Sequence, residues 1–298
     1  MRFGLNLNSN KKNNVVRFPK AFEHPLYYKK NGELTPIPER KAIVGENGVF
    51  YSIVSDKYRL VQHEDVYKTV NKILEELGVD PLLTDVKISR NGGAMLYAVL
   101  TDDCKLLNDD YVYLGFSAYN TYDGSSSLRF DFFGFRVVCS NGLIMPQKIL
   151  DLPKFRHLKG VIDPTYEEIA KTIKGLLDLR LEVLDVLNMA TKSTVSAFEL
   201  VSFIETTFKN YPLLKDKIYR TLKKYGIDLT ETLEEYEEFV KQEKDLEELL
   251  EKLENEEYNL WTAYNSITEV LTHRPGKVDL PNLYKLQRKT GELLALAR

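Results

Sequence analysis

YVYLGFSAYNTYDGSSSLRFDFFGFRVVCSNGLIM, residues 111–145, places two aromatic and β-branched runs on either side of an Asp-Gly pair. Because this pair strongly favours a two-residue turn, the stretch predicts a β-hairpin centred on Asp123–Gly124. With that turn, Ala118 lies opposite Arg129. A slip of one residue would exchange such partners, and the GSSS run permits it.

Both faces of the predicted hairpin carry large apolar side chains. In the register above, one face carries the rings of Tyr113, Tyr119, Phe130 and Phe132. One face must bury against helices, and three uses are open for the other. It packs beneath further helices, it packs against a neighbouring subunit, or it forms a stacking platform for unpaired bases. In the third case Arg129 or Arg136 would contact the nucleic-acid backbone.

The whole sequence predicts an α+β fold, with a mostly antiparallel β-sheet in the N-terminal half packed with helices, followed by an all-helical C-terminal half. Residues 1–44 are rich in Asn and Lys, and we expect a basic arm or loop with little regular structure. Residues 45–160 are expected to form the antiparallel sheet domain with one helix. Residues 161–298 are expected to form a helical region that packs on the sheet.

Helix signals mark the C-terminal half. Asp163 followed by Pro164 predicts a helix start with the aspartate as its N-cap. Ser196, three residues before Glu199, has the spacing of a capping box. Residues 231–257 predict a helix with a narrow apolar seam, which is one side of a coiled pair in the simplest interpretation. The seam consists of Leu246, Leu249, Leu250 and Leu253.

Charge is unevenly distributed, although the net charge is only −3. Residues 1–41 hold nine Lys/Arg against three Glu, whereas residues 231–257 hold thirteen acids against three Lys. A basic arm and an acidic helix on one chain favour self-association or an anionic ligand at the basic end. The alternative is a solvated tail and a solvated helix. The arm cations predicted to neutralise phosphate are Lys11, Lys12, Arg17 and Lys20.

Cellular location is predicted from what the sequence lacks. No apolar run approaches the roughly 20 residues of a membrane helix, and the first residues lack the apolar middle of a secretory signal. We therefore expect a cytoplasmic protein, of the cell or viral host, with no membrane partner. Cys104 and Cys139 are then expected to be reduced thiols. Scarce Gln and abundant Lys, Glu, Ile and Tyr favour a warm-living source.

Catalytic signals are weak. The sequence contains no phosphate-binding GxxxxGK[ST], no GxSxG elbow and no HExxH. Cys139 has no histidine near it in sequence, so a buried strand cysteine is favoured over a nucleophile. Glu269 and His273 share one helix face, but no third metal ligand is visible, and a polar cluster that locks this helix onto the sheet is favoured. We predict no metal and no cofactor, and a non-enzymatic role is favoured.

Three segments carry a family resemblance: NGGAMLYAVL, YNTYDGSSSLRFDFFGFRVVCSNGLI and LWTAYNSITEVLTHRPG with a closing GELLALA. In this order they resemble the phage- and plasmid-encoded family known as domain of unknown function 932. The resemblance spans roughly residues 45–298 and leaves the basic arm unexplained. The matching residues are Gly92, Gly93, Asp123, Gly124, Ser125, Arg136, Val137, Val138, Cys139, Asn141, Trp261, Asn265, Thr268 and His273.

The resemblance implies a mobile-element protein, in a family that carries no agreed activity or catalytic residues. Its setting favours work on DNA, including replication and recombination, and the expected fold is similar in plan to single-strand annealing proteins. The first hypothesis is a non-enzymatic, oligomeric binder of single-stranded nucleic acid. The second is a structural or protein-interaction module of a virus or plasmid, assembled through the acidic helix. The third is an enzyme with an unrecognised site around Cys139, Asn141 and His273.

Overall fold

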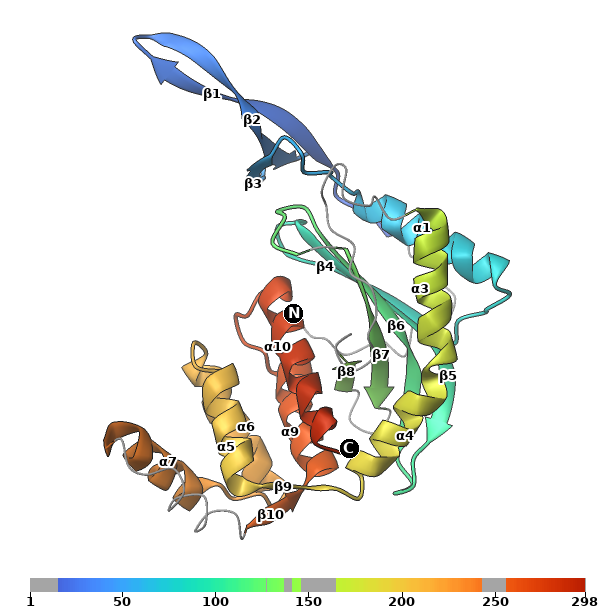
Figure 1. The fold of residues 1–298 in the computed structure, drawn as a ribbon, viewed down its shortest axis with the longest axis vertical. Coiled ribbons are helices and arrows are strands. Elements are labelled where there is room, and N and C mark those ends of the chain that lie inside the picture. The colour runs from blue at the N-terminus through green and yellow to red at the C-terminus, as the bar shows by residue number, and fades with distance from the viewer. Residues whose placement is uncertain (1–15, 127, 137–140, 146–164, 243–255, 298) are drawn as a thin grey trace.

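A computed structural model of the 298-residue chain describes residues 16–126, 128–136, 141–145, 165–242 and 256–297. The fold is α+β, with antiparallel sheets in the N-terminal half and mostly helices in the C-terminal half. Figure 1 shows a curved sheet between two groups of helices, with a two-stranded ribbon projecting from one end. The predicted fold class is confirmed at this level.

The central sheet is an antiparallel meander in the order β4-β5-β6-β7-β8. Each strand pairs with the next one in the chain, so turns and short loops suffice to connect them. The predicted hairpin corresponds to β6 and β7, and β8 is a further strand that was not predicted. The strands are β4 (Leu83–Ile88), β5 (Ala94–Lys105), β6 (Tyr111–Thr121), β7 (Arg129–Arg136) and β8 (Asn141–Met145).

The pairing of β6 with β7 differs by one residue from the predicted register. Ala118 lies opposite Phe130, whereas a two-residue turn would have placed it opposite Arg129. The connection is longer than predicted, because β6 ends at Thr121 and β7 begins at Arg129. The Thr121 hydroxyl closes this wider turn by accepting the Ser126 N–H at 3.3 Å and donating to the Ser126 carbonyl at 3.2 Å.

The one-residue shift places the predicted ring set on two different faces. Phe130 and Phe132 share a face with Phe116, whereas Tyr113 and Tyr119 lie on the other face. A single surface that combines the two tyrosines with the two phenylalanines is therefore wrong. The observed register differs from the predicted one by the one-residue slip that the GSSS run permits.

Helices cover both faces of the sheet (Figure 1). On one face, Phe130 meets Val66 and Ile169 around a small cavity of about 190 Å³. On the other face, the ring of Tyr119 stacks on Tyr284 with 3.8 Å between centroids. The first face is covered by α1 (His63–Glu76) and α3 (Tyr166–Asp178), with α4 (Arg180–Ala190) following; the second is covered by α9 (Leu260–His273) and α10 (Leu280–Gly291). Both apolar faces of the hairpin are thus buried within one chain.

The expectation that residues 1–44 lack regular structure is wrong for the part described. β1 (Ala21–Lys30), β2 (Glu33–Gly45) and β3 (Phe50–Ser55) form a three-stranded antiparallel sheet in the order β1-β2-β3. Asn31 and Gly32 close its first hairpin with φ of 52° and 94°. Asn-Gly is the pair that tolerates positive φ at both central positions of a two-residue turn, so the signal was present in the sequence.

A separate small core joins this three-stranded sheet to the rest of the chain. Ala21, Ile43 and Val54 of the sheet bury against Tyr58 and Tyr122. The outer halves of β1 and β2 extend beyond this core into solvent (Figure 1). We call residues 21–45 the ribbon.

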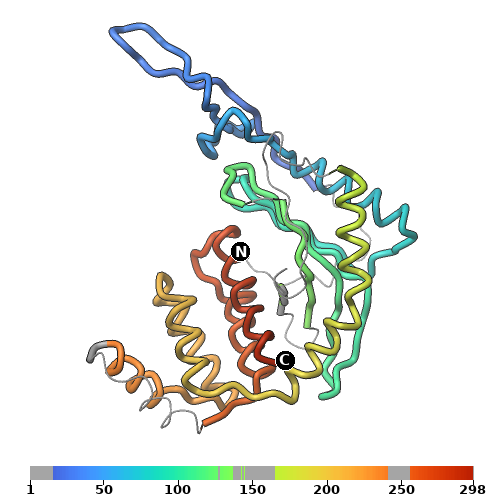
Figure 2. Tube along the Cα trace, viewed as in Figure 1, coloured from blue at the N-terminus to red at the C-terminus, as the bar shows by residue number. Residues whose placement is uncertain are grey.

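The helical half also departs from two expectations. α3 takes its N-cap from Thr165, in a capping box with Glu168, rather than from Asp163. The capping box of Ser196 and Glu199 is confirmed. A short antiparallel sheet interrupts the predicted all-helical half, and the predicted leucine seam lies outside the described residues. Figure 2 traces these elements: β9 (Thr194–Ser196), α5 (Ala197–Thr207), α6 (Pro212–Lys224), α7 (Thr230–Gln242), β10 (Glu257–Asn259) and the 3-10 helix η1 (Glu292–Ala297).

A buried carboxylate ties α10 to the sheet. Asp131 of β7 is fully buried, and its Oδ2 lies 3.0 Å from Nε of Arg288. The Tyr284 hydroxyl donates to the same oxygen. Burial raises the pKa of Asp131, while the Arg288 charge and the Tyr284 hydrogen bond oppose that rise. The pair therefore fixes how α10 sits on the sheet.

Replacing Arg288 by leucine is expected to lower the free energy of unfolding by about 3–5 kcal/mol, because a buried carboxylate loses its cation. Without Arg288 the pKa of Asp131 in the folded state rises further above its value in the unfolded chain. The folded variant then binds the proton more tightly, so the deficit is small at low pH and grows as the pH rises through that raised pKa. Urea unfolding followed by circular dichroism at acidic and at neutral pH measures it.

Lys285→Leu, at an exposed position of the same helix, is the matched control and should leave stability nearly unchanged. The double variant Asp131→Asn/Arg288→Leu should lose the pH dependence of the deficit. An Arg288→Leu deficit of the same size at both pH values would contradict the assignment.

Candidate functional site

The side chains predicted to bind nucleic acid do not form one surface. Tyr119 and Phe130 are buried on opposite faces of the sheet, and Tyr113 is partly buried. Arg129 and Arg136 lie at opposite ends of β7. The sheet therefore offers no stacking platform in this structure, and those three rings are structural.

The structure describes two of the four arm cations that were predicted to contact phosphate. Arg17 and Lys20 are exposed directly before β1, and Arg17 lies 3.5 Å from Glu46. Lys11 and Lys12 lie outside the described residues, as do Val137, Val138 and Cys139. The side chains of Arg17 and Lys20 are exposed to solvent, and their contact with phosphate stays a prediction.

The glycine pair of the family motif lies where the central sheet meets the ribbon. A Cβ atom on Gly92 would lie 3.0 Å from the side chain of Pro19, and one on Gly93 would lie 2.9 Å from the Tyr51 ring. Gly92 also has a φ of 79°, which favours glycine. The pair permits the close approach of Pro19, just before β1, and of Tyr51 in β3 to the central sheet.

The buried His63 lies at the same contact between the two sheets, and it was not predicted from the sequence. The ring of His63 stacks on Tyr122 with 3.8 Å between centroids, and its Nδ1 lies 2.9 Å from the Asn120 amide nitrogen. With that amide donating, Nε2–H is left to donate to the Gly92 carbonyl at 3.2 Å. His63 begins the apolar stripe that continues at Val66, and this spacing was the available signal.

The segment around the Asp123–Gly124 turn contacts Tyr58, which follows β3. The Tyr58 hydroxyl donates to the Thr121 carbonyl at 3.2 Å, and Oδ1 of Asp123 accepts from the Ser125 N–H at 2.9 Å. A Cβ atom on Gly124 would lie 3.4 Å from the Tyr58 ring. These motif residues thus hold the base of the ribbon and do not face a ligand cavity.

The second motif cluster gathers residues from three distant segments. Asp110, at the start of β6, accepts from Nε of Arg136 and, at 3.1 Å, from Nε1 of Trp261. Asp110 is buried, and Trp261 is 3% exposed. The predicted register placed Val112 opposite Phe135 instead of Arg136, so it did not bring Asp110 next to Arg136. With the observed pairing, Asp110 follows on the same side of the strand pair as Arg136.

A cavity of about 170 Å³ adjoins this cluster. Its wall includes Arg136, Trp261 and Asn265 of the motif, with Tyr225 from the end of α6. The Asn265 amide donates to the Trp261 carbonyl at 2.7 Å, and the Tyr225 hydroxyl donates to Glu269 at 2.6 Å. The hydrogen bonds of this wall connect α9 to its neighbours.

The metal alternative for Glu269 and His273 gains no support. Glu269 is engaged by Tyr225, and no group of three or more His, Cys, Asp or Glu in the described segments could hold a metal ion. The Thr272 hydroxyl accepts the Gly142 N–H at 3.2 Å and links α9 to β8. The enzyme hypothesis stays untested, because Cys139 and the side chain of Asn141 are not described.

Exposed aromatic and basic side chains gather on the ribbon. Successive side chains of a strand point to opposite faces, so β1 presents two different surfaces. We call the first the even face; it carries Phe22 and His24 before the irregularity in pairing between Pro25 and Leu26, and Leu26, Tyr28 and Lys30 after it. We call the second the odd face; it carries Tyr27 and Lys29 of β1 with their cross-strand neighbours Pro36 and Leu34 of β2. The exposed fractions are 48% for Phe22, 46% for Tyr28, 53% for Tyr27 and 71% for Leu34.

Comparison with known protein families gives a match over most of the chain. A family model described as a domain of unknown function, DUF932, matches residues 50–292. No curated protein and no solved structure matches the chain. The matched range begins within β3, so β1 and β2 precede it. Among the helices described, none combines the length and the apolar character needed to cross a bilayer.

Trp261→Phe is expected to lower the free energy of unfolding by about 1.5–3 kcal/mol, because a buried carboxylate loses a donor and the smaller ring leaves part of the indole site unfilled. Tyr264→Phe is the matched control. Its hydroxyl, on the same helix, is buried without a partner among the described residues, so its loss should be neutral or stabilising. Denaturant unfolding followed by circular dichroism compares the two, and equal losses would contradict the assigned bond.

Proposed function

Because the chain belongs to the family of the domain of unknown function DUF932, whose description names no activity, we propose its function from the structure. The protein binds single-stranded nucleic acid, and the binding surface is the even face of the ribbon. The supporting observation is a row of exposed rings and cations along β1, outside the sealed sheet.

The rings of the even face suit base stacking. Phe22 and Tyr28 are six residues apart, which is about 20 Å along an extended strand. That spacing leaves room for a flexible single strand to place separate bases on the two rings. Stacking contributes roughly 1–3 kcal/mol per base and tolerates any base. A surface of this kind predicts little sequence preference.

The charges near the even face suit a phosphate backbone. Between residues 16 and 45 there are six Lys/Arg and three Glu. Lys30 lies at the tip of β1, whereas Arg17 and Lys20 lie before its base, so cations flank the two rings. Two of these cations have acidic partners, because Lys41 pairs with Glu23 at 2.8 Å and Arg17 lies 3.5 Å from Glu46. Cations on both sides of stacked bases give binding that weakens as salt rises.

The biological setting is the further part of the proposal. We place the protein in the cytoplasm of a cell or viral host, acting on DNA of a mobile element in replication or recombination. Annealing of complementary strands suits a protein that holds unpaired bases by stacking alone. No catalytic group is needed for that role.

Tyr28→Ala is expected to weaken binding of a fluorescein-labelled oligothymidylate by about 5- to 100-fold, because one stacked base loses its ring. Lys30→Ala is expected to weaken binding and to reduce the slope of log affinity against log salt by about 1. Fluorescence anisotropy titrations at several salt concentrations measure both quantities.

Tyr27→Ala and Lys29→Ala are the matched controls, because they change the same residue types on the odd face of the same strand. Both should bind as the unaltered chain does, within about twofold. No binding by the unaltered chain at low salt, or binding unaffected by salt, would refute the function. Equal effects on the two faces would refute the surface.

A further inference from the structure

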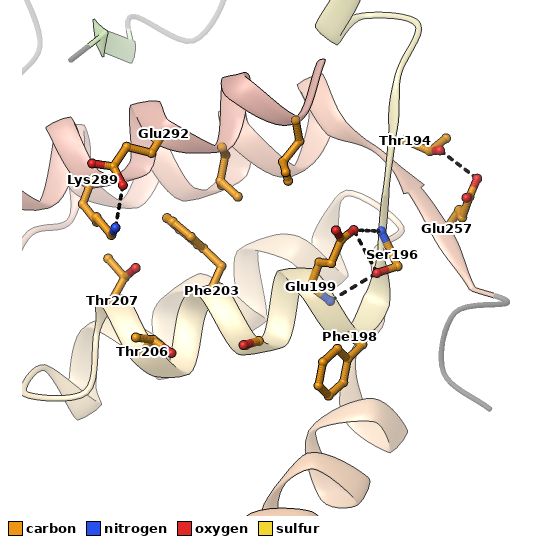
Figure 3. A pocket seen from close by; sticks show the side chains of 13 residues that line it. Thr194, Ser196, Phe198, Glu199, Phe203, Thr206, Thr207, Glu257, Lys289 and Glu292 are labelled. Carbon is orange, nitrogen blue, oxygen red and sulfur yellow. Dashed lines mark hydrogen bonds and ion pairs between the residues drawn. The ribbon is translucent and has the colours of Figure 1, made fainter. Parts of the chain in front are cut away.

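An open groove runs between α5 and the C-terminal end of α10 with η1 (Figure 3). Its volume is about 780 Å³. Phe203 of α5 and Leu293 and Leu296 of η1 give it an apolar floor, and Leu296 is 45% exposed. An apolar groove of this size that stays open to solvent is typical of a docking surface.

The rim of the groove is acidic. Glu199, Glu257 and Glu292 line it, against a single cation, Lys289. Lys289 pairs with Glu292 at 2.5 Å, so its charge is already compensated. Phosphate-rich partners are disfavoured by this rim, whereas a partner that combines apolar anchors with cations is favoured.

The odd face of the ribbon has the complementary chemistry. Tyr27 and Leu34 are large and mostly exposed, and Lys29 lies directly opposite Leu34. In the register of β1 and β2, Lys30 of the even face lies opposite Glu33, whereas Lys29 of the odd face lies opposite the uncharged Leu34. A soluble chain rarely leaves such side chains exposed on a projecting hairpin without a partner.

We infer that the groove receives the odd face of the ribbon of a second copy of this chain. In Figure 1 the ribbon projects from one end of the molecule, and β9 and β10 beside the groove lie towards the other end. The small core at the base of the ribbon fixes its direction, so it does not fold back into its own groove. The contact therefore joins unlike surfaces head to tail, and copies close into a ring or grow into a filament.

The inference does not depend on the proposed binding of nucleic acid. That binding uses the even face, whereas the docking contact uses the odd face of the same strand. Loss of one therefore leaves the other measurable. The docked hairpin is small, so we expect reversible association in roughly the micromolar range.

Sedimentation velocity of the full chain, without nucleic acid, over a micromolar concentration series tests the contact. The unaltered chain should form species larger than a monomer, and they should dissociate as salt rises. The ribbon variant Tyr27→Ala/Lys29→Glu should be monomeric over the same range. The groove variant Glu257→Lys/Glu292→Lys should also be monomeric, with an unchanged circular dichroism spectrum.

Mixing the two monomeric variants identifies the pairing of surfaces. The groove variant keeps an intact ribbon, and the ribbon variant keeps an intact groove, so the mixture should form a dimer and nothing larger. Combining Lys29→Glu with Glu257→Lys/Glu292→Lys in one chain should restore part of the assembly, because the charges are complementary again.

Two even-face changes, Tyr28→Ala and Lys30→Ala, should leave assembly intact. A monomeric unaltered chain across the series would overturn the inference. So would a mixture of the two variants that stays monomeric, or assembly that survives in either variant.

Discussion

The structure depends on the burial of two apolar faces of one β-hairpin. β6 and β7 carry large rings on both sides, and leaving either side in water would cost roughly 25 cal/mol for each Å² of apolar surface. One layer of helices can cover only one face. The chain therefore supplies α1 and α3 for the first face, and α9 and α10 from its far end for the second. This requirement brings distant segments together.

Buried polar groups fix the orientation of the helices on the sheet. Apolar contacts are tolerant of orientation, whereas a buried carboxylate or imidazole needs its partners in fixed places. Asp131 holds α10 on the sheet through Arg288, and Asp110 holds the start of α9 through Trp261. His63 holds the start of α1 against the Gly92 carbonyl. Among the predicted motif residues, Gly92, Arg136 and Trp261 contribute to these joints. Their presence accounts for the fold more directly than for a reaction.

Sealing the sheet moves the exposed chemistry to the periphery. Rings that would otherwise offer a stacking surface are buried in the core. What stays in solvent is a basic, aromatic ribbon at one end and an acidic, apolar groove near the other. Because side chains alternate along a strand, the two faces of the ribbon carry different side chains. The proposed binding of nucleic acid and the proposed association of copies therefore use different faces of the same element.

The fold class, the central hairpin, the capping box at Ser196 and the family could all be predicted from the amino-acid sequence. These follow from local patterns, since turns, caps and strand runs are set by neighbours in the chain. The register of β6 and β7 could not be predicted, because the Thr121 hydroxyl closes a turn wider than two residues. The tertiary structure decided the register, and it also decided which rings are buried. Whether a ring meets solvent or a helix depends on segments more than a hundred residues away, and no local pattern carries that information.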